Sequence, residues 1–324
     1  MIKISLLFIS VLTLFCFMMP SFILRKLKLA DQSFAKVMSV FTLYVAQGAM
    51  VLHGFIMPYD ATVMKGVVQA FLLALLSHIL FYLIAKQCFR KAPDRMKRVL
   101  QFGLIFSNAG YMGIPVISDV FGSDYVIYAT VYLVWFNVFA YSLGRLIYTN
   151  DKKYISLKKA ILNPAVVPIC IGMVIWLTGL GGAMQEALTK DDFAGQAVGL
   201  IYNIVTVLKN MVAPTSMMVI GARLADVDFK GVHKDKYLYP FILIRLFALP
   251  AIMWAIMRVL LGFGIIEANV MAVILILNST PAAAITTMFA ELYDGDSPYA
   301  GKLVAITTIL SVATMPLVAL LLKL

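Results

Sequence analysis

The chain has 324 residues, of which 62% are hydrophobic and 13% charged, and its formal net charge is +11. Soluble domains are about 45–50% apolar and about 25% charged, so the composition excludes a soluble globular protein and indicates a polytopic membrane protein. The positive charge does not indicate nucleic-acid binding, because Lys and Arg lie in short loops between apolar runs. Cys16, Cys88 and Cys170 show neither metal-ligand spacing nor a disulfide framework.

Runs of about 20 apolar residues predict transmembrane helices. In chain order we place ten of them, at residues 4–24, 35–57, 65–86, 99–120, 125–148, 161–180, 197–222, 237–262, 267–290 and 300–322. The first run is longer than the apolar core of a signal peptide, about 7–15 residues, and no small-residue cleavage site follows it. We therefore expect it to be the first span of an all-α polytopic membrane protein.

Lys and Arg predict the orientation of these spans. The loops after the first, third, fifth and seventh spans are rich in them: Arg25, Lys26, Lys28 and Lys36; Lys86, Arg90, Lys91, Arg95, Lys97 and Arg98; Lys152, Lys153, Lys158 and Lys159; Arg223, Lys230, Lys234 and Lys236. Because basic residues accumulate on the cytoplasmic side, both termini are predicted to lie outside the cell membrane. The loop after the ninth span lacks this excess, but its acidic residues count little in the rule.

The second and seventh predicted spans share a sequence. "VAQGAMVLHG" (Val45–Gly54) aligns with "VAPTSMMVIG" (Val212–Gly221) at an offset of 167 residues. Each half then holds five spans, and an odd number orients the halves oppositely across the membrane. We therefore predict two inverted five-helix repeats, at residues 1–148 and 161–324, joined by a short cytoplasmic linker at 149–160.

The fourth and ninth predicted spans contain helix breakers. "FSNAGYMGIP" (Phe106–Pro115) and "LILNSTPAAA" (Leu275–Ala284) each combine Ser and Asn with small residues and Pro. One such segment alone would favour close packing or a kink. Two of them at corresponding positions of inverted halves indicate the binding site of a transporter.

An interrupted helix exposes a new N-terminus, with free N–H groups and a partial positive charge. Ser279 and Thr280 are N-cap residue types and Pro281 suits a first turn, so we expect one half-helix to begin there and another to begin at 113–115. Two such N-termini inside the membrane would bind an anion, with the Asn amides as further donors. The predicted substrate-binding residues of the two segments are Ser107, Asn108, Gly110, Tyr111, Gly113, Pro115, Asn278, Ser279, Thr280 and Pro281.

Few ionisable residues lie inside the predicted spans. His78 in the third span and Arg245 in the eighth are also separated by 167 residues, so each half carries a basic residue at the same position. They could attract the anion or neutralise a second carboxylate; alternatively, each bonds helix-end carbonyls or extends to the membrane surface. We expect Lys209 to extend to the surface, and Asn137 is a further candidate contact.

No Asp or Glu lies at the centre of a predicted span, which argues against cation exchange as the main activity. Carbonyl, Asn and Ser oxygens could still hold sodium, and His78 could titrate near neutral pH, so sodium and proton coupling both remain open. The sequence carries no H-E-x-x-H, G-x-S-x-G or phosphate-binding loop, so we expect neither an enzyme nor a bound cofactor or metal.

Four stretches resemble the auxin efflux carrier family, which includes plant PIN carriers and bacterial permeases for malate, malonate and similar acids. They are "FSNAGYMGIPV", "PTSMMVIGARLA" (Pro214–Ala225), "NSTPAAAITTMFAELY" and "TTILSVATMPLVALLL". The resemblance implies that spans 4 and 9 break and cross. It also implies a scaffold of spans 1, 2, 6 and 7 that forms a homodimer, and a transport domain of spans 3–5 and 8–10 that moves like an elevator.

One position departs from the family pattern, because Gln47 stands where members often have Pro, whereas its repeat partner Pro214 is kept. Gln47 either restores helical hydrogen bonding or faces the substrate path, and we favour the first. Together these features predict a transporter of small organic anions such as carboxylates. The alternatives are a sodium-coupled symporter of the same fold and, less favoured, a membrane receptor or an anion channel.

Overall fold

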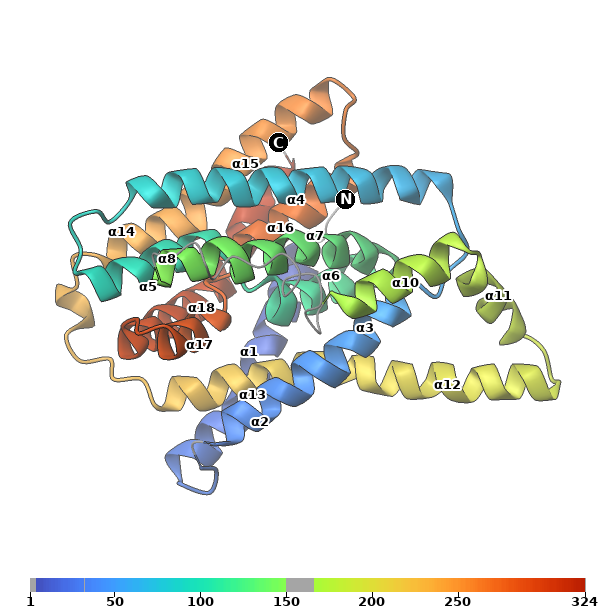
Figure 1. The fold of residues 1–324 in the computed structure, drawn as a ribbon, viewed down its shortest axis with the longest axis horizontal. Helices are drawn as coiled ribbons and strands as arrows, with labels where there is room; N and C mark the ends of the chain where they lie inside the picture. The colour runs from blue at the N-terminus through green and yellow to red at the C-terminus, as the bar shows by residue number, and fades with distance from the viewer. Residues whose placement is uncertain (1–3, 32, 150–165, 324) are drawn as a thin grey trace.

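The computed structural model describes residues 4–31, 33–149 and 166–323, which form helices joined by short loops (Figure 1). The first half contains α1 (Ile4–Lys26), α2 (Ser33–Phe41), η1 (Thr42–Ala46), α3 (Gln47–Gly54), α4 (Ala61–Gln87), α5 (Asp94–Ile105), η2 (Ala109–Gly113), α6 (Ile114–Phe121), η3 (Ser123–Tyr125), α7 (Val126–Phe139), η4 (Ala140–Gly144) and α8 (Arg145–Thr149). The second half contains α10 (Val167–Leu177), α11 (Leu180–Ala187), α12 (Phe193–Asn210), α13 (Val212–Ala225), η6 (Val232–Lys234), α14 (Leu238–Leu243), η7 (Ile244–Ala248), α15 (Leu249–Gly262), α16 (Ala268–Ser279), α17 (Ile285–Leu292), α18 (Ser297–Ala319) and η8 (Leu320–Lys323).

Within the described ranges, 7 helical segments are long and apolar enough to cross a membrane, or up to 8 if the bent pair α10 and α11 is one span. The 7 segments coincide with the first, second, third, fifth, seventh, eighth and tenth predicted spans. The sixth differs from a straight span, because Gly179 adopts a φ of +77° and the chain bends by 76° between α10 and α11. Of the predicted linker at 149–160, the described residues include Thr149 alone.

The fourth and ninth predicted spans are interrupted. Helix α5 ends at Ile105 and helical structure resumes at Ala109, whereas α16 ends at Ser279 and α17 begins at Ile285. The extended stretches between the half-helices lie antiparallel and form an isolated bridge. Asn108 N–H donates to the Pro281 carbonyl (2.8 Å), and Ala283 N–H donates to the Phe106 carbonyl (2.9 Å). Each stretch thus satisfies backbone groups of the other, which is what an interruption inside a membrane requires.

The predicted starts of the half-helices are wrong. The Ser279 and Thr280 hydroxyls donate to carbonyls of their own helix, those of Ile276 and Leu277 (both 2.8 Å), so they end α16 rather than cap α17. Thr280 is extended (φ −64°, ψ 154°) because the following Pro281 disfavours helical geometry before it. The other half-helix was expected to begin at 113–115, but its first turn is the π turn η2, which begins at Ala109.

The second and seventh predicted spans both lose regular helical bonding. In the seventh, α12 ends at Asn210 and α13 begins at Val212, where Pro214 removes a donor from the first turn. In the second, the π turn η1 precedes α3, and Gln47 N–H bonds the Thr42 carbonyl five residues back. The favoured prediction, that Gln47 restores α-helical bonding, is therefore wrong.

Aspartates begin several of the long helices. Asp60 precedes α4, and its carboxylate accepts the Thr62 N–H (2.7 Å) and hydroxyl (2.6 Å). These hydrogen bonds hold the pKa of Asp60 below its usual range. Asp192 caps α12 in the same way by accepting the Gly195 N–H (2.7 Å).

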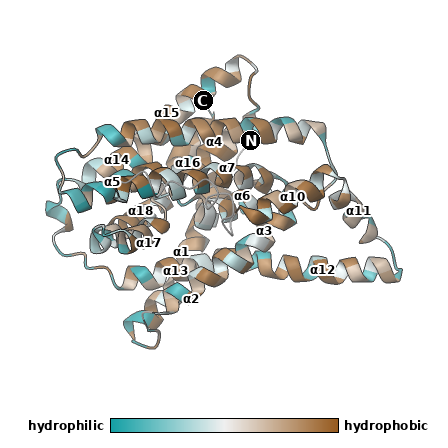
Figure 2. Ribbon diagram, in the orientation of Figure 1, coloured by the Kyte–Doolittle hydropathy of each residue, from teal (hydrophilic) through white to brown (hydrophobic). Residues whose placement is uncertain are grey.

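Helix α1 packs along α13, and α3 packs along α10 and α12. Figure 1 shows α12 and α13 (yellow) following one another along one edge of the molecule, beside α2 and α3 (blue). The remaining helices surround the interruptions, with α4 against α7 and α17 against α18. Hydrophobic residues cover the long helices, and hydrophilic residues gather near their ends (Figure 2). This distribution is the one expected of helices that lie in a bilayer.

Candidate functional site

A chain of buried hydrogen bonds joins the two interrupted spans. The Ser107 and Tyr132 hydroxyls lie 3.4 Å apart, and Tyr132 O–H donates to Asn278 Oδ1 (2.8 Å). Asn278 Nδ2 donates to Ser77 Oγ (3.1 Å), whose hydroxyl donates to the Leu73 carbonyl (2.7 Å). All four side chains are buried. The network therefore connects α4 and α7 to both extended stretches and orders the polar groups between them.

The first half-helix end presents donors at this point. The Asn108 carbonyl accepts the N–H groups of Met112 (3.0 Å) and Gly113 (3.1 Å), so helical bonding starts there. The amides of Ala109, Gly110 and Tyr111 precede those donors and have no acceptor one turn back. Asn108 itself is 4% exposed, and its Nδ2 has no hydrogen-bond partner in the described part of the chain. A donor side chain and a positive helix end therefore converge.

The second half-helix end faces the same crossing. The first bond of α17 runs from Thr286 N–H to the Ala283 carbonyl (2.9 Å), so the amides of Ala284 and Ile285 precede it. The preceding Ala282 N–H donates to Thr307 Oγ1 of α18 (3.3 Å). Both half-helices therefore begin at the paired stretches, although α17 begins four residues beyond Pro281.

Arg245 is fully buried on the π turn η7. Its Nη2 donates to the carbonyl of Thr280 (2.8 Å), the residue that ends α16. A cation at a helix C-terminus opposes the partial negative charge there. Its Nε and Nη1 have no partner among the residues that the structure describes. The guanidinium thus holds the backbone of the interrupted helix and still offers two donors.

His78 is fully buried as well, on α4. Its Nδ1 lies 2.8 Å from the Ala74 carbonyl of its own helix, and its Nε2 has no partner within the described ranges. Phe106 and Tyr132 lie beside its ring, at centroid distances of 6.1 and 5.0 Å, and Phe139 stacks on it at 5.7 Å. The two basic residues at the repeat offset therefore both border the interrupted helices, one through a hydrogen bond and one through aromatic packing.

Glycine at two predicted positions permits close approach. A Cβ on Gly113 would lie 2.7 Å from Leu277 Cδ2, and one on Gly110 would lie 2.9 Å from Gln47 Nε2. Tyr111 contacts other helices instead: its carbonyl accepts the Ser216 hydroxyl (3.0 Å). The two glycines therefore let η2 pack closely against α16 and α3.

The other predicted polar residues have local roles in the structure. Pro115 is buried in the first turn of α6. Asn137 Nδ2 donates to the Leu133 carbonyl of its own helix (2.7 Å). Lys209 Nζ lies 3.3 Å from His53 Nδ1, at the contact between α12 and α3, so it does not extend to the surface alone.

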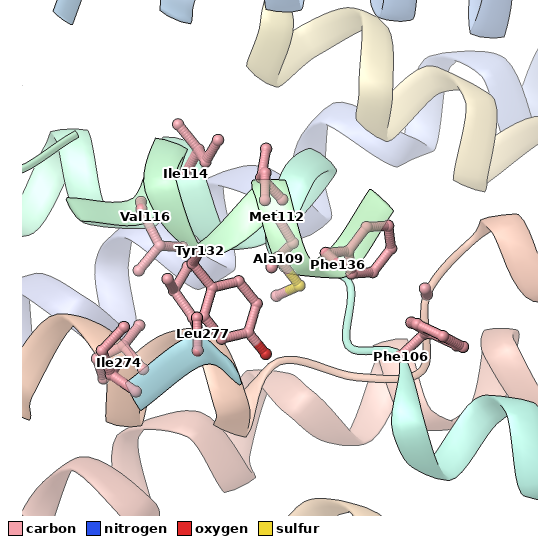
Figure 3. Close-up of a cluster of buried hydrophobic side chains, with 14 of the residues drawn as sticks. Phe106, Ala109, Met112, Ile114, Val116, Tyr132, Phe136, Ile274 and Leu277 are labelled. Carbon is pink, nitrogen blue, oxygen red and sulfur yellow. The ribbon is translucent and has the colours of Figure 1, made fainter. Parts of the chain in front are cut away.

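Sequence reasoning missed Tyr132 and Ser77, which link the two Asn-bearing stretches. Nothing in the repeat indicates them, because Tyr132 lies in an apolar aromatic run and Ser77 pairs at the repeat offset with Ile244. Figure 3 shows the Tyr132 ring among apolar side chains that include Phe106 and Leu277, with its oxygen directed to the extended chain. This apolar surrounding excludes water and strengthens the polar interactions inside it.

A cavity of about 500 Å³ lies elsewhere, where the ends of α1, α6 and α15, the start of α16 and the C-terminal turn meet. It includes Phe121, Arg258 and Lys323, and none of the predicted site residues lines it. The crossing of the interrupted helices is therefore the better candidate site, because it collects buried donors without a partner.

A multi-pass helical membrane protein with two interrupted helices that meet inside the bundle has the architecture of a membrane transporter. The chain matches the family model described as "Membrane transport protein" over residues 6–319. It therefore belongs to this family, that of the auxin efflux carriers, and the resemblance seen in the sequence is confirmed. No curated protein sequence matches the chain significantly. Members of the family are transporters, which fits a protein that is not an enzyme.

Proposed function

We propose that the protein is a secondary active or facilitative transporter of small organic anions, carboxylates in particular. The observation that carries this proposal is the meeting of two half-helix N-termini beside the unpartnered Asn108 amide and Arg245 guanidinium. An anion there would meet donors and positive helix ends. It would meet no buried carboxylate, because none of the described Asp and Glu residues is buried.

We further propose ten spans in two inverted repeats, residues 1–148 and 161–324, with both termini outside the cell membrane. The close packing of α1 on α13 and of α3 on α10 and α12 supports a scaffold of spans 1, 2, 6 and 7. The scaffold would form the homodimer. The helices around the crossing would form a transport domain that carries the anion across by elevator-type motion.

Counterflow of labelled malate into proteoliposomes tests the transporter, with and without a sodium or pH gradient. We expect saturable counterflow, and a gradient that accelerates uptake identifies the coupling ion. Unitary currents would identify a channel, and binding without counterflow would identify a receptor. Either result would contradict the proposal.

Replacing Asn108 by Ala removes the unpartnered amide next to the first half-helix. We expect malate to bind about tenfold more weakly, since hydrogen bonds to charged groups contribute about 1.5–3 kcal/mol. Because Asn108 Nδ2 makes no bond within the described protein, the melting temperature of the empty transporter should stay unchanged. Unchanged malate affinity would remove Asn108 from the site.

Arg245→Gln tests the charge of the buried guanidinium. We expect dicarboxylates to lose about tenfold more affinity than monocarboxylates, because two donors of Arg245 are free to meet a second carboxylate. Titrations of malate and lactate, followed by thermal stabilisation, measure the difference. An equal loss for both acids would mean that Arg245 only holds the Thr280 carbonyl.

A further inference from the structure

The Gln47 side chain lies between α3 and the interrupted fourth span. It is 5% exposed, and its Nε2 lies 2.9 Å from the position that a Cβ on Gly110 would take. Its Oε1 is buried without a hydrogen-bond partner in the part of the chain that the structure describes. The carboxamide therefore packs on the first turn of η2 while its oxygen is left unsatisfied.

The π turn η1 sets the direction of this side chain. It ends at Ala46, directly before Gln47, and the Gln47 N–H closes its last bond to the Thr42 carbonyl. A π turn contains one residue more than an α turn, so the residues after it are rotated by about 100° around the helix axis. Such turns recur at functional sites, and this one is placed where it directs Gln47 toward the crossing.

Two unsatisfied polar atoms therefore border one helix end. Asn108, which precedes η2, offers a donor, and Gln47, which packs on Gly110, offers an acceptor. A buried acceptor without a partner costs about 1–3 kcal/mol, so the arrangement favours a ligand that supplies a donor. A carboxylate alone cannot do so, because both of its oxygens are acceptors. A hydroxyl next to the carboxylate can.

We propose that Gln47 determines substrate specificity and that the site selects hydroxy-substituted carboxylates over unsubstituted ones. The inference rests on the proposed function and adds to it a substrate class and a residue of the scaffold side. The carboxylate lies at the helix end and the Asn108 amide, and the substrate hydroxyl donates to Gln47 Oε1.

Malate and succinate test this inference, because they differ by one hydroxyl group. We expect the wild type to bind malate about tenfold more tightly than succinate, since succinate leaves the Gln47 oxygen unpaired. Gln47→Leu keeps the volume and removes the acceptor, so the ratio should fall to about one, mainly through weaker malate binding. Competition with labelled malate in proteoliposomes and thermal stabilisation in detergent both measure the ratio.

Gly110→Ala is a second and independent variant. Its methyl group would lie 2.9 Å from Gln47 Nε2 and displace the carboxamide, so it should reduce the preference for malate in the same way. Gln196→Leu is the matched control, because Gln196 is exposed on α12, and it should keep the wild-type ratio.

Two results would overturn the inference: a wild type that binds both acids equally, or Gln47→Leu weakening both acids by the same factor. In either case labelled malate counterflow would persist and the proposed function would stand. If the wild type bound neither acid and showed no counterflow, the proposed function itself would fail, and the specificity proposal with it.

Discussion

Asn278→Ala is expected to weaken malate binding about tenfold to a hundredfold and to reduce transport in proportion. Asn278 is fully buried and bonds Tyr132 with its oxygen and Ser77 with its nitrogen. Its removal leaves both hydroxyls without this partner, and an unsatisfied buried group costs about 1–3 kcal/mol. The two extended stretches would lose their alignment at the point where both half-helices begin.

Ligand-induced thermal stabilisation and initial uptake rates measure this effect on the same preparation. Asn269→Ala is the matched control, because Asn269 lies exposed on the same helix and should bind and transport as the wild type does. Tyr132→Phe removes one member of the chain and should cause a smaller loss, about tenfold or less. If Asn278→Ala lowered the melting temperature while malate affinity stayed unchanged, the network would be structural and the binding site would lie elsewhere.

Gly221→Ala is expected to prevent stable folding of the pair α1 and α13. A Cβ at Gly221 would lie 2.1 Å from the Met18 carbonyl oxygen and 2.4 Å from Ser21 Oγ. The nearer atom belongs to the backbone, so the two helices must move apart, and overpacking of this kind costs about 1–3 kcal/mol or more. In a membrane, helix association depends on such close packing of small residues.

Size-exclusion chromatography of the detergent-extracted protein and its melting temperature test the second prediction. We expect most of the Gly221→Ala protein to aggregate and the remainder to melt earlier. Gly262→Ala provides the control: a Cβ there meets nothing within 4 Å, so the variant should elute and melt like the wild type. A Gly221→Ala protein as stable as the control would show that α1 and α13 tolerate a wider separation.

The broken spans show how far local sequence can lead. Gly, Pro and Asn act on the backbone within a few residues, so the interruptions could be predicted at Phe106–Pro115 and Leu275–Ala284. The starts of the half-helices could not, because Thr280 and Pro281 are held extended by pairing with a stretch more than 170 residues away. Capping preferences describe a helix end in isolation, and here a tertiary contact overrides them.

By itself, the sequence determined the membrane class, the approximate spans, the two interruptions and the family, because hydrophobicity and helix breaking are properties of short segments. Only the tertiary structure decided which groups meet. Asn278 joins Ser107 through Tyr132, Arg245 holds the Thr280 carbonyl, and Gln47 faces Gly110. Each of these contacts links helices distant in the chain, and its geometry depends on how the helices pack rather than on the residues that flank it.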